Sequence, residues 1–145
     1  MTQNIKLADI GLIGLGVMGI NLAKNFAEKG FSVIGHDSSP SHAMNEPAIY
    51  VHAQLKDFVR NLAKPRKILF FLPAGQTVEE VIQSLVPYLE PEDLIVDAGN
   101  SHFEDTKRRS QELATKKINY LGLGVSGGED GARNGASFMA GGKPD

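Results

Sequence analysis

The sequence contains no cysteine, which excludes a disulfide framework, a thiolate nucleophile and a cysteine-based zinc site. It also lacks an excess of one charge, because 15 Lys and Arg residues stand against 17 Asp and Glu residues. Without a basic patch, neither nucleic acid nor an anionic membrane is an expected partner. The start, "MTQNIKLAD", lacks the layout of a signal peptide, and no apolar run approaches the length of a membrane span. We therefore expect a cytoplasmic protein.

The chain does contain a regular alternation of two kinds of segment. Its 145 residues suit one domain with a sizeable core, and 41% of them are apolar. Short apolar segments that end in glycine, proline or aspartate are typical of strands buried on both faces. Strands are expected at Ala8–Gly14, Phe31–Asp37, Lys67–Leu72, Asp93–Gly99 and Ile118–Gly124, with a short last one at Ser137–Gly142.

Helical patterns lie between these strands. Thr77 and Glu80 have the spacing of a capping box at the start of the most amphipathic helix. The charges from Lys107 to Lys117 are expected on a solvated helix face. The segment Ser38–Gln54 is expected to be a short helix or a loop. The expected helices are Val17–Lys29, Leu55–Ala63, Thr77–Glu90 (with its last turn bent or ended by Pro87) and, approximately, Asp105–Lys117.

Alternating strands and helices predict an α/β fold of the Rossmann type, a doubly wound and mostly parallel sheet with helices on both faces. The chain shows no internal repeat and no linker, so residues 1–145 are expected to form one dinucleotide-binding domain.

The first glycine cluster has the spacing Gly14-x-Gly16-x-x-Gly19, directly after a predicted strand and at the start of a predicted helix. Such glycines permit the tight turn, the approach of a pyrophosphate and the packing of helix on strand, while the helix N-terminus stabilises the negative charge. Asp37 ends the second strand at the distance expected for a carboxylate that binds the adenosine ribose. A turn or capping role for Asp37 remains the alternative. No basic residue follows directly, so the sequence favours NAD over NADP.

A second glycine-rich run, "VSGGEDGARNGASFMAGG", follows the fifth predicted strand. Ser126, Gly127 and Gly128 lie at the carboxyl end of that strand, where doubly wound sheets bind ligands. Their backbone N–H groups and hydroxyl suit an anion, although a tight loop without a ligand has the same glycine content.

The motifs "GLIGLGVMG", "PAGQTVEEVI", "DAGNSHFEDTKRR" and "GLGVSGGEDGARNGASFMAGG" together resemble the N-terminal domain of the decarboxylating 6-phosphogluconate dehydrogenases, within the β-hydroxyacid dehydrogenase superfamily. The resemblance covers nearly the whole chain and weakens only between Ser38 and Gln54. It implies an oxidoreductase of the pentose phosphate pathway and of gluconate metabolism. The implied substrate is a phosphorylated sugar acid, 6-phosphogluconate, which is oxidised at C3 and then loses carbon dioxide to give ribulose 5-phosphate.

The resemblance also implies roles for individual residues. The implied cofactor-binding residues are Gly14, Leu15, Gly16, Val17, Met18, Gly19, Asp37, Ser38, Ser39, Leu72, Pro73, Ala74 and Asn100. The implied substrate-binding residues are Asn100, Ser126, Gly127 and Gly128. By the resemblance, Asn100 would contact both the nicotinamide and the substrate, and its amide can donate and accept hydrogen bonds at once.

Three departures from the family lie around the cofactor. The family's Asn-Arg-Thr triplet, whose arginine binds the NADP 2′-phosphate, aligns with Asp37, Ser38 and Ser39. A lysine common after the third strand is replaced by Pro73, and the segment from Ser38 to Tyr50 is several residues shorter than in the family. The first two changes reduce positive charge, so NAD or NADP is expected as cofactor with NAD favoured.

The family's catalytic lysine and glutamate, and its all-helical dimerisation domain, come from later in the chain, and no residue here can be assigned those roles. We therefore expect this chain to be inactive alone, and a homodimer only for a full-length member. One alternative is the cofactor domain of a 3-hydroxyisobutyrate-type dehydrogenase, against which Asn100 argues. Another is a stand-alone, non-catalytic nucleotide-binding module. No metal is expected, since ligand spacing is absent from the four histidines, which are His36, His42, His52 and His102.

Overall fold

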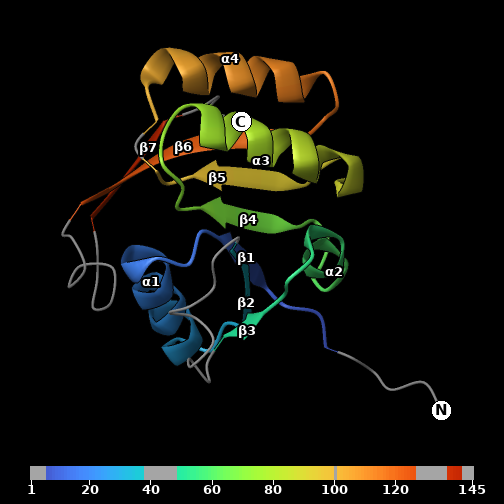
Figure 1. The fold of residues 1–145 in the computed structure, drawn as a ribbon, viewed down its shortest axis with the longest axis vertical. Coiled ribbons are helices and arrows are strands. Elements are labelled where there is room, and N and C mark those ends of the chain that lie inside the picture. Colours follow the sequence, from blue (N-terminus) through green and yellow to red (C-terminus); the bar gives the residue numbers. More distant parts are fainter. Residues whose placement is uncertain (1–5, 38–48, 100, 127–136, 142–145) are drawn as a thin grey trace.

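A computed structural model describes residues 6–37, 49–99, 101–126 and 137–141 (Figure 1). The strands are β1 (Ile10–Ile13), β2 (Val33–His36), β3 (Tyr50–Val51), β4 (Lys67–Phe70), β5 (Leu94–Asp97), β6 (Asn119–Ser126) and β7 (Ser137–Gly141). The helices are α1 (Val17–Glu28), α2 (Leu55–Arg60), α3 (Gln76–Leu85) and α4 (Phe103–Ala114), with a short 3-10 helix, η2, at Val86–Tyr88.

The strands form one seven-stranded sheet in the order β3-β2-β1-β4-β5-β6-β7. All neighbouring pairs are parallel except β6 and β7, which pair antiparallel from Gly122↔Gly141 to Ser126↔Ser137. The order reverses at β1, so β1 and β4 lie side by side at the switch point where doubly wound sheets bind ligands. The predicted fold class is therefore confirmed.

Apolar side chains cover both faces of the sheet, as parallel strands require. One buried cluster joins the sheet to α2, α3 and α4 through residues such as Phe58, Ile82 and Leu113. A second joins the other face to α1 through Leu22 and Ala23. The sheet therefore lies between two helical layers.

Several predicted elements have different bounds. α2 ends at Arg60 rather than Ala63, and Leu62 makes an isolated bridge to Ala8 instead. α4 begins at Phe103 and ends at Ala114, earlier at both ends than expected. Within the segment expected to be a helix or loop, Tyr50–Val51 forms the edge strand β3.

The predicted capping box at Thr77 and Glu80 is wrong. α3 begins at Gln76, its N-cap is Gly75 with φ +100°, and within the described chain no side chain caps it. Thr77 therefore lies inside the helix. The predicted stop at Pro87 is confirmed, because α3 ends at Leu85 and continues only as η2.

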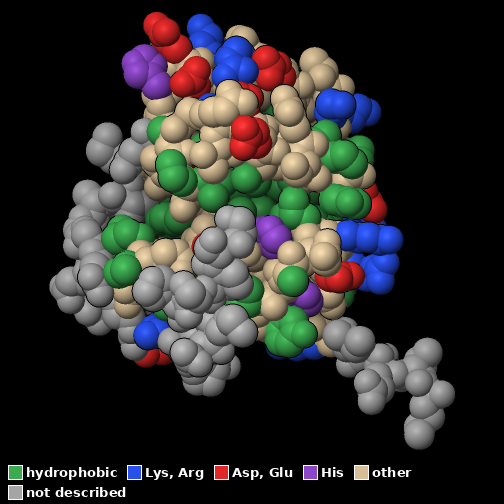
Figure 2. All heavy atoms as spheres, viewed as in Figure 1, with side chains coloured by type: hydrophobic (Ala, Val, Ile, Leu, Met, Phe, Trp, Pro, Cys, Tyr) green, Lys and Arg blue, Asp and Glu red, His purple; other side chains and the backbone are tan. Residues whose placement is uncertain are grey.

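Charged side chains gather at the upper end of the face seen in Figure 2, and apolar side chains form a band across its middle. None of the helices that the structure describes is both long enough and apolar enough to cross a membrane.

Candidate functional site

The carboxyl ends of β1, β2, β4 and β5 meet at one edge of the sheet. Backbone hydrogen bonds continue past the strand ends, from Gly14 N–H to the His36 carbonyl (3.1 Å) and from Phe71 N–H to the Ile13 carbonyl (2.9 Å). In Figure 1 the arrowheads of β4 and β5 point to this edge, and α3 and α4 begin there. The segments that follow these strands are thereby brought together.

The turn from β1 into α1 depends on Gly14 in the loop and Gly19 in the first turn of α1. Gly14 has φ +96°, and a Cβ there would lie 2.3 Å from the carbonyl oxygen of Phe71. A Cβ at Gly19 would lie 2.3 Å from the carbonyl oxygen of Gly14. Both positions therefore require glycine, one for its backbone conformation and both for close backbone packing.

Gly16 is different, because a Cβ added there would meet no described atom within 4 Å. It is the N-cap of α1, and within the described chain no side chain caps this helix end. The first N–H groups of a 12-residue helix therefore lie beside an open position, which suits a phosphate group.

Asp37 follows β2 and lies beside this loop. Its Oδ2 accepts a hydrogen bond from the backbone N–H of Leu15, so a half-buried carboxylate connects the end of β2 to the glycine loop. Ser38 and Ser39, predicted to act with it, lie outside the described residues.

Leu72, Pro73 and Ala74 leave β4 at the same edge, Leu72 half-buried and the other two exposed. A Cβ at Gly99 would lie 2.2 Å from the Leu72 carbonyl oxygen, so the turn after β5 packs against this segment. The structure thus brings together the glycine loop, Asp37 and the segment Leu72–Ala74.

The substrate-side residues are only partly described. Ser126 is the last residue of β6. Within β6, Gly122 pairs with Asp97, the last residue of β5, so β6 extends four residues beyond β5 at the carboxyl edge. Asn100, Gly127 and Gly128 lie outside the described residues. Among the described residues, no group of three His, Asp or Glu side chains could hold a metal ion.

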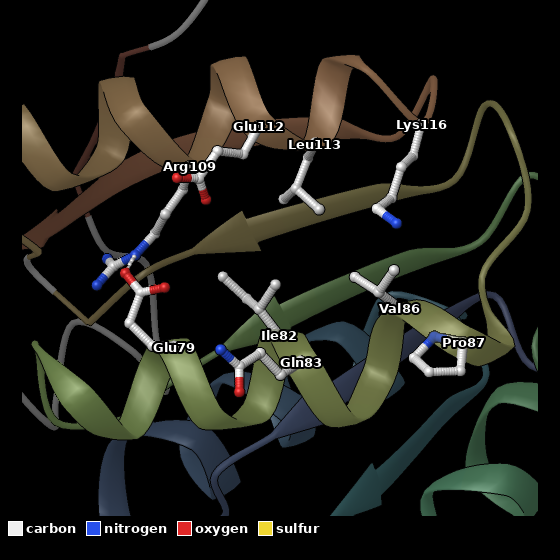
Figure 3. A pocket seen from close by; sticks show the side chains of 9 residues that line it. All are labelled: Glu79, Ile82, Gln83, Val86, Pro87, Arg109, Glu112, Leu113 and Lys116. Carbon is white, nitrogen blue, oxygen red and sulfur yellow. Dashed lines mark hydrogen bonds and ion pairs between the residues drawn. The ribbon is translucent and has the colours of Figure 1, made fainter.

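A buried charged cluster near this edge was missed by the sequence analysis. Arg109 of α4 was expected on a solvated face, but its side chain is 1% exposed. Its Nε donates to Glu79 Oε1 at 2.8 Å, and its Nη1 lies 3.7 Å from Asp97 Oδ2 (Figure 3 shows the Glu79 contact). The spacing of Arg109 and Leu113, one helical turn apart, was the signal that both face the sheet.

The cluster shifts the pKa values of its members. Burial and the neighbouring Asp97 carboxylate raise the pKa of Tyr120, whose hydroxyl donates to Asp97 Oδ2 at 2.9 Å. The hydrogen bond from Arg108 holds the pKa of Glu79 below its usual value, with a smaller contribution from Arg109. Glu79 and Arg109 are therefore a charged pair at neutral pH.

Comparisons with known proteins match this geometry. The sequence model of one family, the NAD binding domain of 6-phosphogluconate dehydrogenase, matches residues 9–145. The decarboxylating 6-phosphogluconate dehydrogenase of Chlamydia pneumoniae is 46% identical over 144 residues, covering 94% of this chain and 30% of that enzyme. The NAD(+)-dependent, decarboxylating enzyme of Bacillus subtilis is 49% identical over 142 residues, with the same coverage of 94% and 30%.

Solved structures agree with the sequence relatives. Plasmodium falciparum 6-phosphogluconate dehydrogenase, described with NADP+ and with 6-phosphogluconate, has a TM-score of 0.88 at 38% identity, covering 93% of this chain and 31% of that one. Mycobacterium tuberculosis 3-hydroxyisobutyrate dehydrogenase has a TM-score of 0.84 at 25% identity, covering 94% and 47%. The chain therefore spans less than a third of the 6-phosphogluconate dehydrogenases that it matches, and it belongs to the family of their NAD-binding domains.

Proposed function

We propose that this chain is the NAD(P)-binding part of a decarboxylating 6-phosphogluconate dehydrogenase. The observation that carries the proposal is the glycine motif, in which Gly14 and Gly19 pack against backbone while a Cβ at Gly16 would meet no described atom within 4 Å. The pyrophosphate of a dinucleotide fits this open position at the N-terminus of α1, where the helix dipole and free N–H groups stabilise its charge.

The other residues at the carboxyl edge would complete the cofactor site. Leu15, Val17 and Met18 belong to the same loop and helix start as the glycines. Asp37, with Ser38 and Ser39, would meet the adenosine ribose, and Leu72–Ala74 would lie beneath the dinucleotide. Asn100 would contact both nicotinamide and substrate, and Ser126, Gly127 and Gly128 would hold the sugar acid. When bound, the nicotinamide accepts a hydride from the substrate.

We further propose a preference for NAD. The Asp37 carboxylate lies beside the glycine loop, where it can accept hydrogen bonds from ribose hydroxyls and repel a 2′-phosphate. The Bacillus subtilis relative is named NAD(+)-dependent, which supports this choice, whereas the Plasmodium falciparum structure is described with NADP+.

The complete reaction, oxidation of 6-phosphogluconate to ribulose 5-phosphate with loss of carbon dioxide, needs a general base and a general acid. The proposal assigns them, and the dimer contacts, to a further helical domain, in keeping with relatives of which this chain covers 30%. The 145-residue chain alone is then a binding unit without turnover.

Titration of the purified chain with NADH and with NADPH, followed by nicotinamide fluorescence, tests the proposal. We expect tighter binding of NADH, and a levelled or reversed preference in the double variant Asp37→Asn/Ser38→Arg. Asp9→Asn is a matched control, since Asp9 Oδ2 also accepts a backbone N–H (Ser32, 2.8 Å) but precedes β1, at the opposite end of the sheet.

Each outcome is informative. Tighter binding of NADPH would contradict the role given to Asp37, and a loss of preference in Asp9→Asn would show that the effect is not local. No binding of either nucleotide would contradict cofactor binding by this chain. A chain completed with a relative's remaining domain, tested on 6-phosphogluconate and 3-hydroxyisobutyrate, separates the two dehydrogenase readings. A stand-alone nucleotide-binding module predicts that the completed chain turns over neither acid.

A further inference from the structure

The carboxylate of Asp97 connects the end of β5 to the turn that follows it. The side chain is buried, and its Oδ1 accepts the backbone N–H of Gly99 at 3.0 Å. Its Oδ2 accepts the hydroxyl of Ser101 and, at 2.9 Å, the hydroxyl of Tyr120. One carboxylate thus holds the residues on either side of position 100.

Arg109 in turn holds this carboxylate from α4. Its Nη1 is buried, has no hydrogen-bond partner among the described residues, and lies 3.7 Å from Asp97 Oδ2. Its other nitrogens donate to Glu79 Oε1 (2.8 Å) and to the Gly75 carbonyl (3.3 Å) at the start of α3. Because a buried charge is costly without its partner, the cluster keeps β5, α3 and α4 in a fixed relation.

The turn that Asp97 holds lies against the proposed cofactor site. A Cβ at Gly99 would lie 2.2 Å from the Leu72 carbonyl oxygen, and one at Gly14 would lie 2.3 Å from the carbonyl of Phe71. A change in the position of Gly99 would therefore move backbone beside the segment Leu72–Ala74. Because Gly99 has no side chain, no packing contact of its own can keep it at its distance from Leu72.

We propose that Asp97 is a positioning residue, which fixes Gly99 and Ser101 so that the nicotinamide half of the cofactor is held, while Arg109 and Tyr120 orient its carboxylate. The inference rests on the proposed function and extends it to residues that contact no ligand. The adenosine half would be held by Gly14–Gly19 and Asp37, which lie outside the turn that Asp97 holds.

The chain contains a matched control for Asp97. Asp93 directly precedes the same strand and is also buried against an arginine, with Arg66 Nη1 at 2.9 Å from its Oδ2. Its oxygens also accept backbone N–H groups, from Arg66 and Glu90 at 2.8 Å each. Asp93 differs in lying at the amino end of β5, away from the carboxyl edge.

The test compares binding of NADH with binding of ADP-ribose, which lacks the nicotinamide, to the 145-residue chain by calorimetry. In Asp97→Asn we expect NADH affinity to fall at least about tenfold more than ADP-ribose affinity, because a small displacement of the groups that hold the nicotinamide lowers the affinity by a large factor. Asp93→Asn should change both affinities by the same factor. Equal losses for both ligands in Asp97→Asn, or no loss, would overturn the inference. Should Asp97→Asn fail to fold, Tyr120→Phe keeps the ring and removes one hydrogen bond, with the same expected direction.

Hydrogen exchange at the Gly99 amide gives a readout that needs no ligand. Exchange should accelerate at least about tenfold in Asp97→Asn and stay unchanged in Asp93→Asn, since only the first replaces the carboxylate that accepts that amide with a weaker, neutral acceptor. An unchanged rate in Asp97→Asn would overturn the inference. If the wild-type chain binds neither NADH, NADPH nor ADP-ribose, the proposed function fails, while the exchange rates still decide whether Asp97 positions the turn.

Discussion

Replacing Gly16 with alanine should weaken cofactor binding strongly while leaving the fold intact, and Gly14 and Gly19 provide the contrast. A methyl group at position 16 meets no described atom within 4 Å. The cost of alanine at a helix N-cap is about 0.5–1 kcal/mol. The reduced entropy of the unfolded chain offsets about 0.4–1 kcal/mol of it. The free energy of unfolding of Gly16→Ala should therefore stay within about 1 kcal/mol of wild type.

Gly14→Ala and Gly19→Ala should behave differently. The left-handed backbone at position 14, with φ +96°, costs an alanine about 1–2 kcal/mol. The 2.3 Å approach to the Phe71 carbonyl adds about 1–3 kcal/mol. At position 19, alanine stabilises the helix by about 1 kcal/mol through its higher helix propensity. The close contact of its Cβ with the Gly14 carbonyl destabilises by more, so the net loss is up to about 2 kcal/mol. From most to least stable, the expected order of the variants is Gly16→Ala, Gly19→Ala and Gly14→Ala.

Urea unfolding followed by circular dichroism measures the stabilities, and nicotinamide fluorescence measures NADH binding. Because a methyl group at position 16 would occupy the place of the pyrophosphate, affinity should fall at least about tenfold in Gly16→Ala. Wild-type affinity in Gly16→Ala would refute the assignment of the pyrophosphate to this loop. A loss of stability in Gly16→Ala as large as in Gly14→Ala would refute the distinction between open and packed glycines.

Three further predictions concern stability. Lys117, three residues after the end of α4, has a left-handed backbone with φ 59°, and after the end of α1 the residue with such a backbone is Gly30, with φ +95°. Lys117→Gly should therefore raise the free energy of unfolding in urea by about 0.5–1 kcal/mol, and no gain would contradict the backbone argument. Burial lowers the pKa of His52 below 6.5, Asp57 raises it in part and His36 lowers it further. Below about pH 6.5 the unfolded chain then binds more protons than the folded chain, so the free energy of unfolding should fall as the pH drops. This fall should be less steep in His52→Gln, and an equal slope in both proteins between pH 5 and 7 would contradict the prediction. The Arg108 bond holds the pKa of Glu79 below 4.5, so its contribution is present above pH 4.5 and lost on acidification through the folded-state pKa. In thermal melts Glu79→Gln should have a lower melting temperature than wild type at pH 7, and its melting temperature should fall less between pH 5 and pH 3. An equal fall in both proteins would contradict the pairing of Glu79 with the two arginines.

Much of the fold followed from local pattern. Parallel strands buried on both faces give apolar runs that differ from the amphipathic helices between them, and these runs located six of the seven strands. β3 was missed because Tyr50–Val51 has only two residues and is defined by pairing with β2, which no local pattern encodes. The capping box failed because Glu79 and the Gly75 carbonyl bind Arg109 from α4, so distant contacts fix the start of α3.

In the candidate site, too, some residues could be placed from the sequence and others could not. The glycine loop and Asp37 could be placed from sequence, since a strand, a turn and a helix fix their relation locally. Arg109 was placed wrongly, because a charged side chain favours the surface unless partners such as Glu79 and Asp97, 30 and 12 positions earlier in the chain, meet it inside. The roles of Ser38, Ser39, Asn100, Gly127 and Gly128 stay predictions.

Asp97, the last residue of β5, and Asp93, directly before the strand, also bear on how the chain avoids misfolding. Asp93 and Asp97 are four positions apart, so both point to the same side of the strand, each toward its own arginine. A slip of β5 by two residues would preserve the alternation of its apolar side chains, which therefore does not forbid the error. It would move both carboxylates away from Arg66 and Arg109 at once and leave two buried carboxylates without their charged partners, at a cost of several kcal/mol each. Charge thus excludes a mispaired sheet that hydrophobicity alone would tolerate.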